Sequence, residues 1–289
     1  MLETEKRNPA SMHLHTMSNV EIADLMNKTN DTIESAIAAN YTTIDAAITA
    51  CTNSLQTGGR IIYMGAGTSG RLGVLDAAEC VPTFNVDPTL VVGLIAGGHE
   101  AMFSAAEGAE DNSSLGETDL QHLGLQPTDT VIGLAASGRT PYVIGGLNYA
   151  NSVGATSIAI ATNTHSKIGA IAKIAIELAT GPEILTGSTR LASGTAQKEV
   201  LNMISTITMI RMGKVYSNLM IDVKPSNIKL QRRARNIIHD ITNAEPAAIE
   251  QALQAANNEV GVAIVMLRKH LPVEESKQLL QNHTVAELI

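Results

Sequence analysis

The sequence contains very little aromatic surface. Phe, Trp and Tyr make up 2% of its 289 residues, and tryptophan is absent, which argues against stacking platforms for bases or sugar chains. The formal net charge is -8, which argues against nucleic acid as a partner. A small ligand would therefore be held mainly by hydrogen bonds and charge.

Cysteine is scarce too, and long apolar runs are absent. Cys51 and Cys80 are the only cysteines, which is too few for a disulfide framework or a metal cluster. No stretch of about 18 apolar residues occurs, so no membrane span is expected. The first residues also lack the apolar core of a signal peptide. A cytoplasmic protein is the simplest interpretation.

Metal ligands and a serine nucleophile motif are not evident either. No G-x-S-x-G elbow is present, although a Ser/His/Asp triad stays open on sequence alone. The histidines do not have the spacing of metal ligands, so no metal is expected. They include His13, His15, His99, His122 and His165.

What the chain does have is a regular alternation of short apolar runs and helical patterns. The runs show little apolar/polar alternation, which is typical of strands buried on both faces of a parallel sheet. The alternation predicts a doubly wound α/β domain, with a flavodoxin-like, five-stranded parallel sheet in the order 2-1-3-4-5. The predicted strands are 60–65, 90–96, 130–136, 156–161 and 174–178, and the helical patterns between them are 69–78, 99–110, 141–152 and 166–170.

The ends of the chain have a different pattern. Residues 1–17 are polar and are predicted to be extended, and two helical patterns follow them. A long helix is predicted over 193–217, and the chain beyond Pro225 is wholly helical in pattern, with short helices at 245–257, 260–270 and 273–281. We therefore predict N-terminal helices in 1–57, the α/β domain in 58–220 and a small all-helical subdomain in 221–289.

Two loops repeat one arrangement. Residues 61–71 and 131–140 each contain an apolar run, a turn of Gly, Ser and Thr, and an arginine that leads into a helical pattern. A strand that runs into a helix N-terminus presents free backbone N–H groups, which bind anions and phosphate above all. In the predicted order these loops follow neighbouring strands at the switch point, where ligands bind. The candidate phosphate ligands are Thr68, Ser69, Gly70, Ser137, Gly138, Arg139 and Thr140.

The class of phosphate ligand can be narrowed. Residues 65–70 match G-x-G-x-x-G, but a dinucleotide site also needs an acid about 20 residues on, at the end of the second strand. Here the first acid, Glu100, comes too late. Neither loop has the G-K-[ST] of a nucleotide P-loop. A phosphomonoester remains, and the alternative is that both loops are ordinary Gly-rich turns. A third polar loop, with Ser188 and Arg190, is a candidate to close the same cleft.

Carboxylates are the candidates for acid–base chemistry. Glu79 lies among apolar residues ahead of Pro82, which is expected to stop the helix. Burial and a helix C-terminus both disfavour a charged carboxylate, which suits a general acid. Glu107 and Glu110 are predicted to share one helix face at i, i+3. For each of these acids the alternative is a solvated helix end.

Several of these motifs closely resemble the N-acetylmuramic acid 6-phosphate etherase family, and the likeness covers nearly the whole chain. The resemblance implies a sugar isomerase (SIS) domain, a homodimer, no cofactor and a cytoplasmic enzyme of bacterial cell-wall amino-sugar recycling. The related glucokinase regulatory protein shares the signature but has two SIS domains. One departure is Ala192, where family members often have Lys. The matching segments are 4–8, 65–73, 76–80, 92–98, 107–111, 135–143, 187–190 and 194–198.

The same resemblance implies a reaction and residue roles. The family cleaves the ether between sugar C3 and D-lactate, so Glu110 would be the base at C2 and Glu79 the acid on the ether oxygen. Glu107, Ser188 and Arg190 would support them, and Ser69 and Ser137 would bind the phosphate of the sugar phosphate. Two alternatives stay open. One is an aldose–ketose isomerase that uses the same C2 deprotonation, and the other is a non-catalytic sugar-phosphate sensor.

Overall fold

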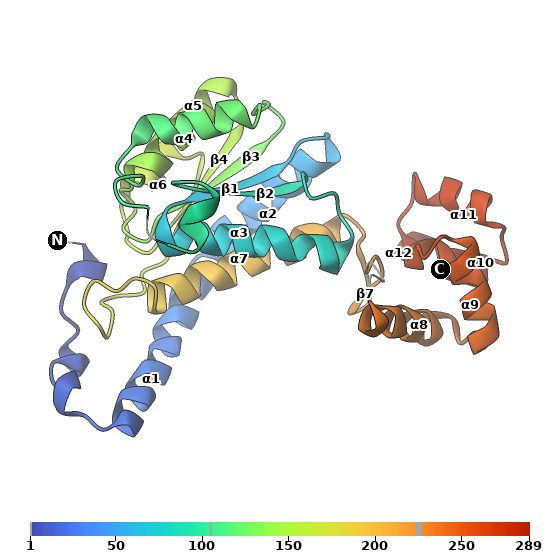
Figure 1. Ribbon diagram of the computed structural model, residues 1–289, viewed down its shortest axis with the longest axis horizontal. Coiled ribbons are helices and arrows are strands. Elements are labelled where there is room, and N and C mark those ends of the chain that lie inside the picture. The colour runs from blue at the N-terminus through green and yellow to red at the C-terminus, as the bar shows by residue number, and fades with distance from the viewer. Residues whose placement is uncertain (1, 105, 224–226) are drawn as a thin grey trace. The chain divides into compact units, whose positions relative to one another are not determined.

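Five short parallel strands form the sheet that the alternating sequence pattern predicts (Figure 1). The computed structural model describes residues 2–104, 106–223 and 227–289. The strand order is β2-β1-β3-β4-β5, which confirms the predicted order, and β1 and β3 are buried along their whole length. The strands are β1 (Ile61–Gly65), β2 (Val91–Ile95), β3 (Thr130–Leu134), β4 (Thr156–Ala161) and β5 (Ile174–Glu177).

Helices cover both faces of this sheet. Helices α4, α5 and α6 lie over one face, and α2, α3 and α7 lie over the other (Figure 1). The first face buries a continuous core in which Leu120, Tyr142 and Leu147 pack against Ile62 and Val131. These helices are α2 (Tyr41–Gln56), α3 (Gly67–Phe84), α4 (Ser113–His122), α5 (Pro141–Val153), α6 (Lys167–Ile171) and α7 (Ala192–Arg211).

The chain divides into two compact units. The first contains Met1–Ala78 and Thr89–Ser205, and the second contains Glu79–Pro88 and Thr206–Ile289. Besides the sheet, the first unit includes α1 (Asn19–Ala38). The second unit has its own apolar core around α10, which makes it a structure of its own rather than an appended tail. Its elements are β6 (Val215–Tyr216), β7 (Leu219–Met220), α8 (Ile228–Thr242), α9 (Pro246–Ala255), α10 (Val260–Lys269), α11 (Val273–Leu280) and α12 (Val285–Leu288).

Some element boundaries differ from the predictions. The N-terminal segment is not extended but forms short 3-10 turns at Glu3–Glu5, Pro9–Ser11 and Leu14–Thr16. The long helix α7 ends at Arg211, because Gly213 follows with a left-handed backbone (φ 76°) and leads into the β6–β7 hairpin. Pro225, where the helical tail was predicted to begin, lies outside the described residues.

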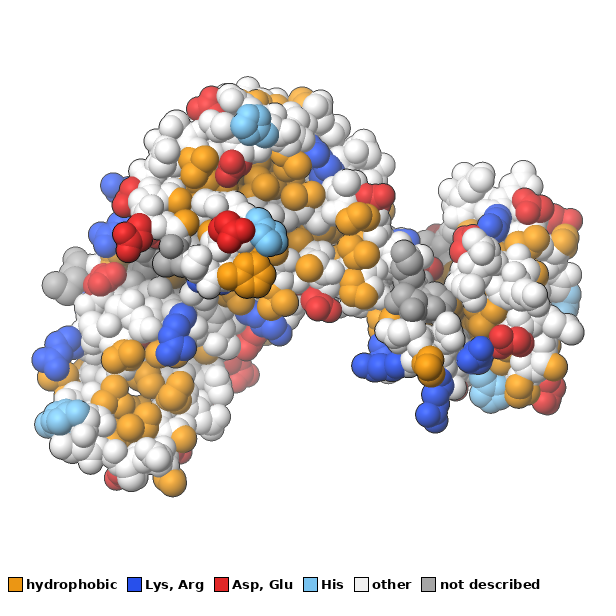
Figure 2. All heavy atoms as spheres, viewed as in Figure 1, with side chains coloured by type: hydrophobic (Ala, Val, Ile, Leu, Met, Phe, Trp, Pro, Cys, Tyr) orange, Lys and Arg blue, Asp and Glu red, His pale blue; other side chains and the backbone are white. Residues whose placement is uncertain are grey.

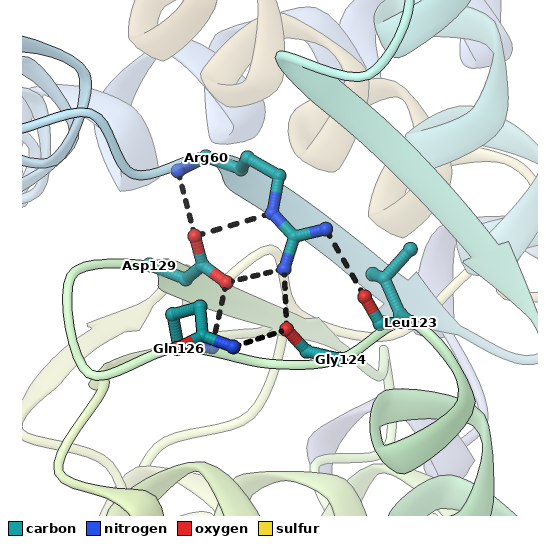
Figure 3. Close-up of polar contacts among 5 residues, drawn as sticks. All are labelled: Arg60, Leu123, Gly124, Gln126 and Asp129. Carbon is teal, nitrogen blue, oxygen red and sulfur yellow. Dashed lines mark hydrogen bonds and ion pairs between the residues drawn. The ribbon is translucent and has the colours of Figure 1, made fainter.

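An ion pair between the buried Asp129 and the partly buried Arg60 fixes the amino ends of β1 and β3 (Figure 3). The carboxylate of Asp129 accepts hydrogen bonds from Arg60 Nη2 at 2.6 Å, from the Arg60 amide at 2.8 Å and from the Gln126 amide at 2.9 Å. The guanidinium also donates to the carbonyl oxygens of Leu123 and Gly124, at 3.1 and 3.0 Å. Only 1% of the Asp129 side chain is exposed, so its charge depends on these donors.

We expect Asp129→Ala to lower the free energy of unfolding by about 3–5 kcal/mol, because it leaves Arg60 and two amides without their acceptor. Urea unfolding measures this loss. Asp129 is at the opposite edge of the sheet from the loops that follow β1 and β3, so the effect should be on stability alone. Asp31→Ala, an exposed acid of α1, is the control and should change stability by less than about 0.5 kcal/mol. A similarly small loss in Asp129→Ala would contradict the prediction.

Candidate active site

The two Gly-rich loops lie side by side at the carboxyl edge of the sheet. Strands β1 and β3 are hydrogen-bonded neighbours, with Gly65 opposite Leu134. A β-carbon on Gly65 would lie 2.8 Å from the amide nitrogen of Gly70 and 3.0 Å from the carbonyl oxygen of Leu134, so only glycine permits this packing. The first loop (residues 65–70) and the second loop (residues 135–140) therefore meet at the switch point of the sheet, as predicted.

At two other helices of this edge, carboxylates of the chain accept hydrogen bonds from the amides at the helix start. Glu177 accepts hydrogen bonds from the two amides just before α6, both at 2.7 Å. Glu183 is buried and accepts from the amides of Ala192 and Ser193 at the start of α7, both at 2.9 Å. These carboxylates take the place that an external anion would take at α6 and α7.

Helices α3 and α5, which follow the two Gly-rich loops, have no such carboxylate among the described residues. Neither has an acidic residue in its first turn, and Thr140, the N-cap of α5, makes no side-chain capping bond. The first amides of a helix have no acceptor within it and attract negative charge. In α5 the amide of Tyr142 already donates to the carbonyl oxygen of Glu110, at 3.0 Å, so α3 is the more open of the two.

The side chains of the first loop differ in how far they can reach a ligand. Thr68 is half-buried. Ser69 is buried, and its hydroxyl donates to Oε1 of Gln197 on α7 at 2.8 Å, which leaves its oxygen to accept a further bond. Gly70 permits close packing, since a β-carbon there would lie 2.6 Å from the carbonyl oxygen of Gly65. The first loop therefore offers mainly backbone amides and one free hydroxyl.

The second loop has a backbone that requires glycine. Gly138 has a φ of 69°, and a β-carbon there would lie 2.4 Å from the β-carbon of Ser166. The Ser137 hydroxyl accepts a long hydrogen bond from the amide of Arg139, at 3.4 Å. Thr140 is half-buried, and Arg139 is exposed with no polar side-chain partner among the described residues. The second loop therefore presents two hydroxyls and a free guanidinium.

The start of α7, directly after the third polar loop, packs against the first loop. A β-carbon on Gly194 would lie 3.5 Å from Cγ2 of Thr68. Because Glu183 fills the amides at the start of α7, the contribution of the third polar loop to an anion site is limited to side chains. Ser188 is half-buried, and Arg190 lines a cavity of about 390 Å³ together with residues of α1.

Glu107 and Glu110 are not on a helix, so the prediction that they share a helical face is wrong. They lie in turns around Gly108, whose φ of 76° a helix does not permit. The next helix, α4, begins only after Asn112, whose side chain accepts from the amide of Leu115 at 3.2 Å. Both glutamates are exposed. Of the two, Glu110 is joined to the start of α5 by its backbone hydrogen bond.

Glu79 is an exposed residue of α3, not a buried helix end. The helix runs on to Phe84 with Pro82 inside it, so the proline removes one backbone donor without ending the helix. Glu79 is also the first residue of the second compact unit.

The described residues hold no group of three or more His, Cys, Asp or Glu that is arranged to bind a metal ion.

None of the helices in the described part is both long and apolar enough to cross a membrane. Basic and acidic side chains are interspersed on the face of the sheet-containing unit that Figure 2 shows.

Known proteins resemble this chain over nearly its whole length and nearly the whole of their own. An N-acetylmuramic acid 6-phosphate etherase of Lactobacillus acidophilus is 53% identical over 290 residues, which cover 100% of this chain and 97% of that protein. The etherase of Pectobacterium atrosepticum is 54% identical over 98% of this chain and 93% of its own length. The chain belongs to the N-acetylmuramic acid 6-phosphate etherase family.

The domain comparisons agree with the etherase family and with the observed sheet. Residues 43–151 match the N-terminal SIS domain of glucokinase regulatory protein, and residues 113–206 match the SIS domain. A protein of Escherichia coli CFT073 is similar in structure, with a TM-score of 0.51, 17% identity and coverage of 70% of this chain and 97% of that one. A phosphoheptose isomerase from Francisella tularensis has a TM-score of 0.50 at 12% identity, with 67% and 100% coverage. These structures share the fold.

Sequence reasoning missed two sets of contacts near the two Gly-rich loops. Arg71, the arginine after the first loop, donates to the carbonyl oxygens of Ala101 and Met102 at 2.7 and 3.0 Å, so it holds the segment after β2. Thr4 is fully buried, and Asn163 Nδ2 donates both to its hydroxyl and to the carbonyl oxygen of Ala136, each at 3.0 Å. The only signal for Thr4 was its place in the N-terminal family motif.

Proposed function

We propose that the protein is a carbon–oxygen lyase that cleaves the D-lactyl ether of N-acetylmuramic acid 6-phosphate. The products are N-acetylglucosamine 6-phosphate and D-lactate, and the role is cell-wall amino-sugar recycling. The observation that carries the proposal is sequence identity: this chain is 53% and 54% identical, over 100% and 98% of its length, to two proteins named for this activity. The adjacent N-termini of α3 and α5, to which no carboxylate of the described residues bonds, support a phosphate ligand there.

In this proposal the sugar phosphate binds between the first and second loops. The open amides of α3 bind phosphate oxygens together with the hydroxyls of Thr68 and Ser137, while Ser69 turns its hydroxyl from Gln197 to the ligand. Gly70 and Gly138 keep the backbone close enough for this, and Thr140 adds a further hydroxyl. Ala192 supplies no charge where relatives often have Lys. Arg139 supplies the positive charge of the second loop, and Ser188 and Arg190 support the site from the third loop.

The reaction is an elimination followed by addition of water. The aldehyde at C1 of the open-chain sugar acidifies the C2 proton, which Glu110 removes. The electron pair forms the C2–C3 double bond, the C3–O bond breaks, and Glu79 gives its proton to the departing lactate oxygen. Water then adds its hydroxyl to C3 and a proton to C2. No electrons leave the substrate, so the chemistry requires no redox cofactor.

Three further features belong to the proposal. The protein acts as a homodimer in the cytoplasm, as the family resemblance implies. Residues 58–220 supply the sugar-phosphate-binding domain, between the N-terminal segment 1–57 and the helical subdomain 221–289. Glu107, exposed on the same turn as Glu110, supports the site without transferring a proton.

Incubation with N-acetylmuramic acid 6-phosphate, followed by an assay for free D-lactate, tests the function. We expect equimolar D-lactate and N-acetylglucosamine 6-phosphate. An aldose–ketose isomerase would instead convert a hexosamine 6-phosphate that has no lactyl ether, and a sensor would bind the substrate without turnover. Measurable binding with no release of lactate would contradict the proposal.

A further inference from the structure

The position of Glu110 depends on the elements around its turn. The backbone hydrogen bonds within residues 106–112 join near neighbours. In the described part of the chain, one hydrogen bond ties residues 106–111 to another element, and it runs from the amide of Tyr142 to the carbonyl oxygen of Glu110 at 3.0 Å. The Glu110 carboxylate is exposed and makes no bond with the described residues, so its location follows from its backbone.

Tyr142 is itself held firmly. It is fully buried, and its hydroxyl donates to Oδ2 of Asp119 on α4 at 2.7 Å. Burial, together with the hydrogen bond and charge of Asp119, raises the pKa of Tyr142 far above its ordinary value. The phenol therefore keeps its proton at neutral pH and remains a donor to α4.

Helices α4 and α5 lie side by side (Figure 1), and their backbones approach closely at two glycines. A β-carbon on Gly116 would lie 2.0 Å from the carbonyl oxygen of Tyr142, and one on Gly145 would lie 1.8 Å from the carbonyl oxygen of Ser113. Real β-carbons do not approach backbone so closely, so a side chain at either glycine must push the helices apart. Ser113 opens α4 three residues after Glu110, so such a shift would reach the Glu110 turn.

We propose that Tyr142 and the glycine contact between α4 and α5 are a positioning device for Glu110. The contact places the Glu110 turn against the first turn of α5, which begins directly after the second loop. One helix start therefore fixes both the proposed base and one side of the proposed phosphate site. This inference rests on the proposed function, because it concerns the distance between the base and a sugar held by its phosphate.

The test uses Gly145→Ala in the full-length protein. Exchange of the C2 proton in heavy water and release of D-lactate should fall together, by about 10-fold to 100-fold in kcat, since a shift of about 1 Å can cost that much. KM and the inhibition constant of inorganic phosphate should stay within about twofold. Tyr142→Phe keeps the backbone donor and removes only the bond to Asp119, so it should fold and give a smaller loss in kcat. Asn148→Ala, an exposed position of α5, is the matched control and should behave like the parent.

A merely structural role for the contact predicts a different pattern. Both variants would then unfold at lower urea concentration and keep the parent kcat per folded molecule, which would overturn the inference. A rise in KM with an unchanged kcat would also overturn it, because the contact would then position the phosphate site rather than the base. A parent protein that releases no lactate refutes the proposed function itself, whereas an active parent with unaffected variants refutes only the positioning role.

Discussion

Glu110→Gln is expected to abolish both D-lactate release and exchange of the C2 proton with solvent. An amide cannot accept the C2 proton, and a positioned general base is typically worth about 10²–10⁴ in rate. The substitution keeps the size of the side chain and leaves the backbone bond from Tyr142 intact, so the fold should be retained. Deuterium incorporation at C2 in heavy water, followed by mass spectrometry, measures the first step apart from lactate release.

Glu107→Gln is the matched control for this experiment. Glu107 is exposed, as Glu110 is, and lies on the same turn, but in the described residues its carbonyl oxygen accepts no hydrogen bond from α5. We expect its variant to exchange the C2 proton within about tenfold of the parent, since it supports the site without transferring a proton. If Glu110→Gln exchanges the C2 proton at the parent rate, another group is the base. If Glu107→Gln loses more of the exchange rate than Glu110→Gln does, Glu107 is the base and Glu110 the supporting residue.

The sheet was predictable because strands buried on both faces leave a strong pattern. The runs around Ile62, Val131 and Ile158 are apolar without alternation, and all three side chains are fully buried in the sheet. The strand order that the alternation predicts is enough to place the two Gly-rich loops side by side. The predicted switch point is where the structure has two helix N-termini without carboxylate caps.

The details of the candidate site were less predictable, because they depend on single backbone angles and on distant partners. The i, i+3 spacing of Glu107 and Glu110 indicated a helix, but the positive φ of Gly108 decides the turn. Nothing in the sequence distinguished Glu183 from the other acids. It accepts hydrogen bonds from amides at the start of α7, and only the fold brings that helix start to it. Asn163 bonds Thr4 across 159 positions of the chain, a distance at which local patterns give no signal.

Such contacts also explain why the backbone amides lack a carboxylate acceptor at some helix starts and have one at others. The chain supplies Glu177 to α6 and Glu183 to α7, and each carboxylate satisfies two amides. A helix N-terminus without such a partner keeps unsatisfied donors, which water or a ligand must satisfy. Among α3, α5, α6 and α7, the two helices without such a carboxylate in the described residues are α3 and α5, which follow the two Gly-rich loops. The placement of these carboxylates therefore favours the same phosphate position as the glycine pattern.

Glu79→Gln should separate the two halves of the reaction. Without an acid to protonate the lactate oxygen, cleavage of the C3–O bond should slow by about 10²–10⁴, while Glu110 still removes the C2 proton. We therefore expect deuterium to enter C2 in heavy water although little D-lactate is released. Because Glu79 is exposed on α3, glutamine should not disturb the helix, and Glu79→Asp, which keeps the acid on a shorter side chain, should recover part of the lactate release. Parallel loss of exchange and lactate release in Glu79→Gln would contradict its role as the acid, because the residue would then be needed before the C3–O bond breaks.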